Sequence, residues 1–495
     1  MNNYRDANRK EINDAMEKSW RSFYEYRKLP LKSRADFMRT IGIELEKNSD
    51  DLIQTAQQET NLSAERLHGE LMRTILQLNQ YATAAEKGEW LEARIDTASK
   101  ENQSSHDIRK MLVPLGPVVV FGASNFPFAY STAGGDTACA FAAGCPVIVK
   151  AHPAHAETSE KVAKAILNSV DKCKLPGGIF SHIHGASVEV GKALVMHPRT
   201  KAVGFTGSLA GGKQLFDWGN QRENPIPVFA EMGSINPVFL MAEKLKESAE
   251  EIAETYAASI TQGIGQFCTN PGLIIGIEGD DLQNFMRMLG DKIKKSPPGK
   301  MLHPGIAKAF DEKRNRALNE KNVTIVSVSD IQKKEHEGSP TLVTASGYDF
   351  LNNPVLHQEV FGPYSLIIRC KDIQQMIEVA RNLEGQLTST LMASDNDLIS
   401  NNELIEEIKN ICGRFVLNGV PTGVQVCLSM QHGGPFPATT DSRFTSVGAD
   451  GIKRFARPVA FQNWPNKFLP DELKNENPLQ IRRTINNEMT KDPVH

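Results

Sequence analysis

The feature that most constrains the fold is a series of short apolar runs rich in β-branched residues, each followed by a segment with helical periodicity. Residues 117–122 form the first run, and residues 146–149 and 201–205 repeat the pattern. Such runs suit strands that are buried on both faces of a parallel sheet. Their alternation with helices predicts βαβ units in a doubly wound α/β fold, whose ligands lie at the carboxyl ends of the strands.

The same patterns extend over most of the chain. Before residue 95 the apolar residues recur at helical spacing, and Pro30 separates the first two helices. The expected helices are 8–29, a segment around 35–45, 67–82, 128–143, 157–170, 187–196, one from 209, 248–259, 280–294, 372–382 and 398–411. Further expected strands are 178–180, 228–234, 273–275, 364–368, 389–391 and 415–417. A second alternating region therefore follows the first.

Length and charge limit the class of protein. A chain of 495 residues is too long for one core, so two large domains or more are expected. The balance of 56 basic against 59 acidic residues gives no electrostatic case for nucleic acid or membrane partners. Without a signal segment or a membrane-spanning apolar run, the cytoplasm is the expected location. The seven cysteines have no CxxC spacing, which argues against a zinc site or a disulfide framework, and no metal is expected.

Cys268 is the candidate nucleophile. It lies in a stretch of small and polar residues, 263–272, in which glycines allow the backbone to approach a substrate closely. Glu231 ends an apolar strand beside Gly233 and suits a general base, with its pKa raised by partial burial. The alternatives are a cysteine that only fills the core and a glutamate that only caps a helix or forms a salt bridge.

Two strand ends predict a phosphate-bearing ligand. The turn Phe205-Thr206-Gly207-Ser208 places a glycine and a hydroxyl where helix amides favour a phosphate. Lys150 ends another strand, where its ammonium would reach a ribose hydroxyl or a phosphate. The usual dinucleotide fingerprint G-x-G-x-x-G is absent, so other groups must hold the cofactor.

Five motifs together resemble the aldehyde dehydrogenase superfamily in their order and approximate spacing, over nearly the whole chain. They are Asn125-Phe126-Pro127, Phe205-Thr206-Gly207-Ser208, Glu231-Met232-Gly233, Gly265-Gln266-Phe267-Cys268 and Glu359-Val360-Phe361-Gly362-Pro363. Within the superfamily, residues 432–440 and 150–155 are similar to the 2-oxoglutarate semialdehyde (2,5-dioxovalerate) dehydrogenases, close relatives of an NADP-dependent bacterial fatty aldehyde dehydrogenase.

The resemblance implies a thiol mechanism for oxidation of an aldehyde to a carboxylate. Cys268 would attack the aldehyde, while the amide of Asn125 and the backbone N–H of Cys268 would stabilise the oxyanion. Glu231 would then activate the water that hydrolyses the thioester. Ser124 and Ser234 depart from the family pattern without removing a reacting group.

The resemblance also implies NADP or NAD as the cofactor. Pro153 stands three residues after Lys150, where NAD-preferring relatives often place a glutamate, so a ribose 2′-phosphate is not repelled. His152 and His155 are expected to be solvent-exposed loop residues, with contact to that phosphate as the alternative. The resemblance implies Lys150 and Glu359 at the cofactor ribose groups, Ser208 at a pyrophosphate oxygen and Phe361 beside the nicotinamide. Phe205 and Gly207, in the same turn as Ser208, are also expected to bind the cofactor.

The family architecture assigns the domains. Residues 1–95 and 115–233 would form the NAD(P)-binding domain, and 234–452 the catalytic domain with the cysteine nucleophile. Residues 96–114 and 453–470 would supply oligomerisation strands that extend a partner's sheet, followed by a C-terminal tail, 471–495. A homodimer or homotetramer is therefore expected.

The substrate implied by the resemblance is 2-oxoglutarate semialdehyde, which is oxidised to 2-oxoglutarate. Its distal carboxylate needs a fixed cation, for which Arg73 and then Arg66 are the candidates. The alternative is a long aliphatic aldehyde, with Phe126 and Phe436 as apolar walls. Other classes remain open: a cysteine hydrolase that pairs Cys268 with His432, a non-catalytic structural relative, and an enzyme that transfers the acyl group to coenzyme A.

Overall fold

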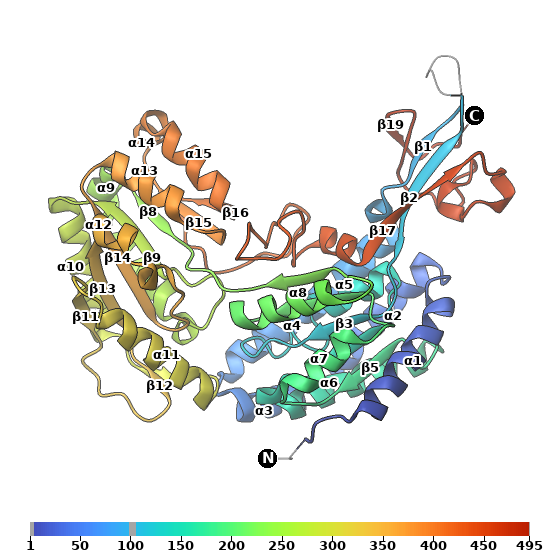
Figure 1. Cartoon of the computed structure of the whole chain (residues 1–495), viewed down its shortest axis with the longest axis horizontal. Helices are drawn as coiled ribbons and strands as arrows, with labels where there is room; N and C mark the ends of the chain where they lie inside the picture. The colour runs from blue at the N-terminus through green and yellow to red at the C-terminus, as the bar shows by residue number, and fades with distance from the viewer. Residues whose placement is uncertain (1–3, 99–104, 495) are drawn as a thin grey trace.

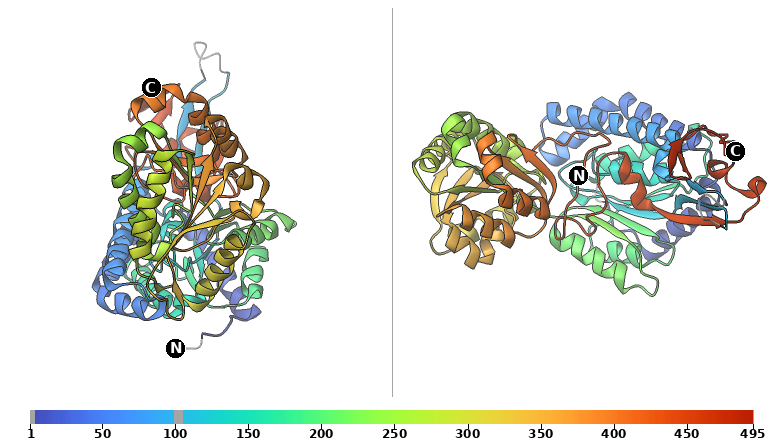
Figure 2. Two further views of the ribbon diagram at one scale, coloured as in Figure 1. Left: turned by 90° about the vertical axis from the view of Figure 1, so that its left-hand side faces the viewer. Right: turned by 90° about the horizontal axis from the view of Figure 1, so that it is seen from above.

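The structure is a computed structural model that describes residues 4–98 and 105–494. Two α/β units lie side by side, and a narrow sheet projects from the N-terminal one (Figures 1 and 2). Part of the expected oligomerisation segment, residues 99–104, lies outside the described residues. Among the helices of the described part, none is both long enough and apolar enough to cross a membrane.

Four helices open the chain, of which the periodicity predicts three; the third helix, at 49–60, was not expected. The side chain of Asn8 caps the first helix and Ser63 caps the fourth, which ends at Gly88 in the left-handed region. The apolar stripe of the fourth helix, including Leu67 and Leu71, is fully buried. The four helices are α1 (Arg9–Tyr26), α2 (Leu31–Lys47), α3 (Ser49–Thr60) and α4 (Ala64–Lys87).

The first unit contains a five-stranded parallel sheet in the order β5-β4-β3-β6-β7. This arrangement confirms the predicted doubly wound α/β class. The strands are β3 (Val118–Phe121), β4 (Val147–Lys150), β5 (Phe180–Ile183), β6 (Ala202–Thr206) and β7 (Val228–Glu231). The helices between them are α5 (Gly135–Ala143), α6 (Ala156–Lys172), α7 (Val188–Met196) and α8 (Leu209–Gln221).

Two elements of this unit begin later than their sequence predicts. Helix α5 begins at Gly135 rather than at residue 128, because the Glu70 carboxylate accepts hydrogen bonds from the backbone N–H groups of Phe128 and Ala129. Strand β5 begins at Phe180. A Cβ on Gly178 would lie 2.4 Å from Ser22 Oγ, so the chain turns against α1 before the strand begins.

The second unit contains a seven-stranded sheet in the order β11-β13-β14-β9-β8-β15-β16. All neighbouring strands are parallel except β11 and β13. The strands are β8 (Val238–Leu240), β9 (Leu273–Ile277), β11 (Thr324–Val328), β13 (Thr341–Ser346), β14 (Tyr364–Cys370), β15 (Gln386–Met392) and β16 (Cys412–Leu417). The helices are α9 (Ala242–Thr261), α10 (Asp280–Lys295), α11 (Pro304–Leu318), α12 (Gly347–Asn352), α13 (Ile373–Asn382), α14 (Asp395–Ser400) and α15 (Asn402–Ile411).

The projecting sheet has the order β17-β2-β1-β18-β19. The segment expected to be a C-terminal tail contributes β18 and β19 to it, so that expectation is corrected. The strands are β1 (Arg94–Asp96), β2 (Ile108–Pro114), β17 (Ala456–Gln462), β18 (Arg483–Ile485) and β19 (Glu488–Thr490). A short pair, β10 (Gly299–Lys300) and β12 (Glu337–Gly338), stands apart. The short 3₁₀ helices are η1 (Glu89–Leu91), η2 (Pro153–His155), η3 (Gln262–Gly265), η4 (Pro354–His357), η5 (Ala449–Phe455), η6 (Asn466–Phe468) and η7 (Asp471–Leu473).

After β16 the chain crosses back to the first unit, and we call residues 418–455 the return segment. It runs beside β7: the backbone N–H of Met232 donates to Ala438 O at 2.8 Å, and Thr440 N–H donates to Ala230 O at 3.1 Å. The sequence placed these residues within the catalytic domain, 234–452. In the structure the middle of the return segment packs against the last strand of the first unit.

Candidate active site

Cys268 lies in a loop that is fixed on two sides. Gly263, Ile264 and Gly265 all have positive φ, and a Cβ on Gly265 would lie 2.3 Å from the Gly362 carbonyl. The buried side chain of Asn236 donates from Nδ2 to Cys268 O and Asn270 O, each at 2.9 Å. Close backbone approach and an amide clamp therefore set the direction of the thiol.

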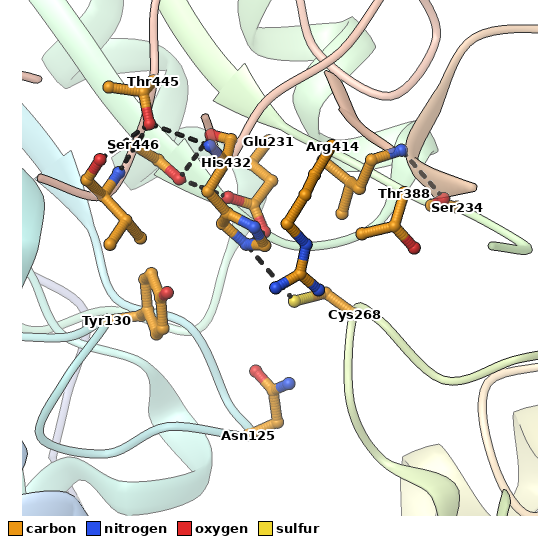
Figure 3. Close-up of polar contacts among 12 residues, drawn as sticks. Asn125, Tyr130, Glu231, Ser234, Cys268, Thr388, Arg414, His432, Thr445 and Ser446 are labelled. Carbon is orange, nitrogen blue, oxygen red and sulfur yellow. Dashed lines mark hydrogen bonds and ion pairs between the residues drawn. The ribbon is translucent and has the colours of Figure 1, made fainter. Parts of the chain in front are cut away.

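Glu231 and His432 lie beside the thiol (Figure 3). Cys268 Sγ is 3.7 Å from His432 Nε2, and the same nitrogen is 3.1 Å from Glu231 Oε1. Ser446 Oγ donates to the other carboxylate oxygen at 2.6 Å. His432 is fully buried and its Nδ1 has no hydrogen-bond partner among the described residues. The return segment thus supplies two of the contacts of Glu231.

These contacts overturn one expectation about Glu231. Burial alone raises the pKa of this carboxyl, but the adjacent His432 and the hydroxyl of Ser446 outweigh it and hold the pKa below its ordinary value. Burial, reinforced by the Glu231 charge, raises the pKa of Cys268 well above that of a free thiol. In this arrangement the carboxylate is ionised and the thiol is neutral at pH 7.

Asn125 faces the same loop from the first unit. Its side-chain Nδ2 donates to the backbone carbonyl of Gln266 at 3.2 Å. Its backbone carbonyl accepts a hydrogen bond from the Arg66 guanidinium at 3.2 Å. The amide carries a second hydrogen, which is free to meet an oxyanion formed at Cys268. Gln266, which the sequence analysis did not single out, also holds Leu302 N–H through its side-chain oxygen at 2.9 Å.

A cavity of about 440 Å³ opens next to Cys268 between the two units. Five of the six expected cofactor residues line it, together with Asn125: Phe205, Gly207, Ser208, Glu359 and Phe361. Ser208 Oγ accepts from Gly211 N–H and caps α8, so the N-terminus of that helix faces the cavity. Burial raises the pKa of Glu359 to about 7. These residues fit a dinucleotide that bears phosphates and ribose hydroxyls.

Lys150 is the sixth expected cofactor residue and ends β4 beside this edge of the sheet. Burial lowers its pKa, while the charge of Asp6 acts in the opposite direction. The two nearby histidines are not loop residues in solvent: His155 is fully buried with Nε2 2.7 Å from Ala123 O, and His152 is half-buried in the cavity wall. Pro153 is exposed in the turn between them.

Of the residues expected to touch the substrate, two lie close to Cys268. Phe126 packs edge-on against Phe267, with ring centroids 5.7 Å apart. Arg73, which is half-buried, donates to Tyr130 Oη at 3.3 Å, and its charge acts on Cys268. Arg66 lies over the rings of Phe126 and Phe267 and 3.6 Å from the Glu70 carboxylate.

Phe436 is 56% exposed, and its backbone oxygen accepts from Gly385 N–H. Phe436 does not line the cavity next to Cys268 or the small cavity beside Glu231 and His432. Its place in a substrate tunnel therefore stays a prediction.

Arg414 is a site residue that the sequence did not indicate. It reaches from β16 toward Cys268 (Figure 3), and the two side chains interact electrostatically. Its guanidinium donates to the carbonyls of Gly423 and Pro421, while its Nε has no partner among the described residues. A single arginine just before a predicted strand, 415–417, carries no local signal, because its role depends on residues far along the chain. His432 stood in a motif, but its contact with Glu231 spans 201 positions.

The comparisons with known proteins agree with this geometry. The model of the aldehyde dehydrogenase family matches residues 1–436. The chain is 45% identical over 475 residues to alpha-ketoglutaric semialdehyde dehydrogenase 2 of Azospirillum brasilense, covering 96% of this chain and 90% of that protein. It is 42% identical over 485 residues to alpha-ketoglutaric semialdehyde dehydrogenase of Acinetobacter baylyi, covering 97% and 92%.

Solved structures share the fold. A glyceraldehyde-3-phosphate dehydrogenase from Methanocaldococcus jannaschii, complexed with NADP, aligns with a TM-score of 0.77 at 18% identity, covering 92% of this chain and 95% of that one. A betaine aldehyde dehydrogenase from Staphylococcus aureus, in complex with NAD+, aligns with a TM-score of 0.80 at 17% identity, covering 93% and 89%. The predicted architecture of two α/β units and a bridging sheet is thereby confirmed.

Proposed function

The chain belongs to the aldehyde dehydrogenase family, and we propose that it oxidises 2-oxoglutarate semialdehyde to 2-oxoglutarate with NADP or NAD. The observation that carries the proposal is that Cys268 and Asn125 line the same cavity as the expected cofactor residues, while Glu231 lies beside the thiol on the other side of His432 Nε2. The two relatives named for alpha-ketoglutaric semialdehyde support this substrate over a long aliphatic aldehyde.

The residues of the site divide the chemistry between them. The Cys268 thiol first passes its proton to the ionised Glu231 carboxylate, which releases it to solvent before the second half of the reaction. The sulfur then forms a bond to the aldehyde carbon, and the negative charge on the carbonyl oxygen is met by the second N–H of the Asn125 amide. A dinucleotide held by the residues that line the cavity would supply the acceptor for the hydride that leaves this carbon. Glu231, ionised and held by His432 and Ser446, then takes a proton from the water that attacks the thioester, and the Cys268 thiolate leaves.

Two arginines suit the distal carboxylate of the substrate. Neither Arg73 nor Arg414 has a carboxylate within ion-pair distance among the described residues, and the Nε of each is buried without a partner. Arg66 differs, because Glu70 lies 3.6 Å away and balances its charge. A half-buried cation without a counterion gains most from an anionic ligand, so we assign the carboxylate to Arg73 and Arg414.

A substrate panel with NADP tests this assignment. Arg414→Leu should lower kcat/KM for 2-oxoglutarate semialdehyde at least tenfold, about 1.4 kcal/mol, and change hexanal less than about threefold. Arg73→Leu should act in the same direction. Arg66→Lys is the matched control and should affect both aldehydes equally. An equal loss for both aldehydes in Arg414→Leu would show that this residue only holds the Gly423 and Pro421 carbonyls.

The same panel tests the substrate itself. The wild-type protein should prefer the semialdehyde to hexanal and decanal in kcat/KM. If either aliphatic aldehyde exceeds it by about tenfold, the 2-oxoglutarate semialdehyde assignment fails and aldehyde dehydrogenation alone remains. Cys268→Ser should abolish oxidation of all three aldehydes.

The cofactor preference depends on Pro153. With no carboxylate at this exposed position, kcat/KM for NADP should be at least comparable to that for NAD. Pro153→Glu should shift the preference toward NAD by roughly 1 to 3 kcal/mol, because the new carboxylate repels the 2′-phosphate. Pro153→Gln keeps the size without the charge and should shift it much less. A strong NAD preference in the unmodified protein contradicts the proposal.

We further propose that the chain forms a homodimer or a homotetramer. Strand β16 ends the seven-stranded sheet with one edge unpaired within the chain, and Leu417 on it is 53% exposed. The projecting sheet likewise has open edges at β17 and β19. Open edges of this kind favour pairing between copies of a chain.

A further inference from the structure

Away from the active site, the edge of the first sheet carries two histidines and a glutamate that point at one another. His182 is on β5, the edge strand, and His184 follows two positions later. Glu160 lies on α6, which packs against this strand. His182 Nδ1 and His184 Nε2 lie 3.0 and 2.8 Å from the same oxygen, Glu160 Oε2. All three ligand atoms lie within 4.8 Å of one another.

We propose that Glu160, His182 and His184 bind a divalent transition metal ion, with Zn²⁺ as the representative. Two imidazoles and one carboxylate are the ligand types that Zn²⁺ and its neighbours in the first transition row prefer. Bonds of about 2.0 to 2.2 Å place such ligands roughly 3 to 3.5 Å apart. The side chain of Glu160 is 53% exposed, so it can rotate to this spacing and leaves room for water to complete the coordination.

A buried hydrogen-bond chain supports His182 from behind. Its Nε2 lies 2.7 Å from Ser159 Oγ, which lies 2.5 Å from Thr132 Oγ1, and both hydroxyl residues are fully buried. When Nε2–H donates to Ser159, the lone pair of Nδ1 faces the Glu160 carboxylate, and a cation between the two acceptors relieves their repulsion. Outer partners of this kind orient metal-binding histidines.

The site joins three segments of the first unit. The ring of Tyr4 stacks on His184 at 4.2 Å, and Ala7 N–H donates to the His184 carbonyl at 3.0 Å. An ion bound by Glu160 and the two histidines would therefore link α6 to the edge strand β5. It would also stabilise the N-terminal segment, which contacts His184 through Tyr4 and Ala7. None of the three ligands lines the cavity next to Cys268, so we assign the ion a structural role rather than a catalytic one.

The experiment must first remove a second group of residues that would compete for the metal ion. Glu231, Cys268 and His432 also present a carboxylate, a thiol and an imidazole within 4.8 Å of one another, and would take up Zn²⁺. Binding is therefore measured by calorimetry in the full-length Cys268→Ser protein after treatment with a chelator. About one equivalent of Zn²⁺ should bind, and added Zn²⁺ should raise Tm. Co²⁺ should give visible absorption bands that report its coordination.

Variants at the cluster decide the outcome. In the Cys268→Ser background, Glu160→Gln and His184→Gln should each weaken Zn²⁺ binding at least tenfold and abolish the Co²⁺ bands. Glu160 is exposed, so Glu160→Gln should fold normally. His336→Gln is the matched control, since His336 lies 3.4 Å from Glu335 in an exposed pair, and it should bind as its parent does. Absence of binding in Cys268→Ser, or binding unchanged by Glu160→Gln, overturns the proposal.

Discussion

At the scale of single residues, the active site keeps its two reacting groups in opposite states. Glu231 is buried but stays ionised because His432 and Ser446 contact its two oxygens. The same negative charge adds to burial in raising the pKa of the Cys268 thiol. The protein without its ligands therefore protects the nucleophile by keeping it protonated.

This arrangement predicts how Cys268 reacts with iodoacetamide in the absence of cofactor. Alkylation should be slow at pH 7 and should still be rising above pH 9, because only the thiolate reacts and the thiol pKa is raised. Glu231→Gln removes the neighbouring charge and should speed alkylation at pH 8 on the order of tenfold. The modified peptide is quantified by mass spectrometry, with Cys139, buried away from the site, as the internal control. A wild-type rate that levels off below pH 8 contradicts this electrostatic account.

The sequence indicated the proposed reacting residues better than the residues around them. Cys268, Glu231 and Asn125 stand in short motifs, and the structure brings them to one cavity mouth. Arg414 was missed, and His432 was considered only for a hydrolase. Their roles arise from contacts across more than a hundred positions, which local periodicity and propensity do not encode. The expected raised pKa of Glu231 was wrong for the same reason.

At the scale of elements, the loop that follows α9 and carries Cys268 is positioned by Asn236, which lies in the connection between β7 and β8. Asn236 follows β7 with φ of 48°, and its amide holds the carbonyls of Cys268 and Asn270. Its own oxygen accepts from Ser234 and Thr388, so the clamp is itself fixed by the second sheet. Sequence patterns predicted the strand before Asn236, at 228–234, but neither β8 after it nor the left-handed backbone of Asn236 itself.

Asn236→Ala should separate positioning from stability. The variant loses two hydrogen bonds to the loop and places alanine at a positive φ, so kcat should fall about tenfold to a hundredfold. Asn418→Ala is the matched control, because Asn418 has φ of 49° and also makes two hydrogen bonds, to the backbone of Ala393. Both variants should lose about 1 to 3 kcal/mol of unfolding free energy. Equal loss of kcat in both would remove the positioning role of Asn236.

At the scale of the whole molecule, several sheet edges have no strand paired to them among residues 4–98 and 105–494. The sequence predicted a bridging sheet from 96–114 and 453–470, and the structure adds β18 and β19 from the segment expected to be a tail. The pairing of the C-terminal strands could not be predicted from the sequence pattern. Strands β18 and β19 are only three residues long, and the register of β18 is set by its pairing with β1.

Leu417→Lys tests whether β16 is an interface. A charge on this edge strand should prevent pairing with a second copy, so the protein should shift from an oligomer toward a monomer in light scattering coupled to size exclusion. Ile399→Lys is the matched control, since Ile399 is 80% exposed on α14 away from the edge. An unchanged mass for Leu417→Lys would place the interface elsewhere.

The return segment has a consequence for the fate of the acyl group. In the proposed mechanism, formation of the thioester needs Cys268 and the cavity. Its hydrolysis needs Glu231 in the position that His432 and Ser446 give it. The two halves of the reaction therefore depend on different stretches of the chain. Substitutions confined to residues 418–455 would partition the same intermediate between water and another nucleophile, such as a thiol, while oxidation of the aldehyde continues. Changes in product can thus begin in a part of the sequence that belongs to neither sheet.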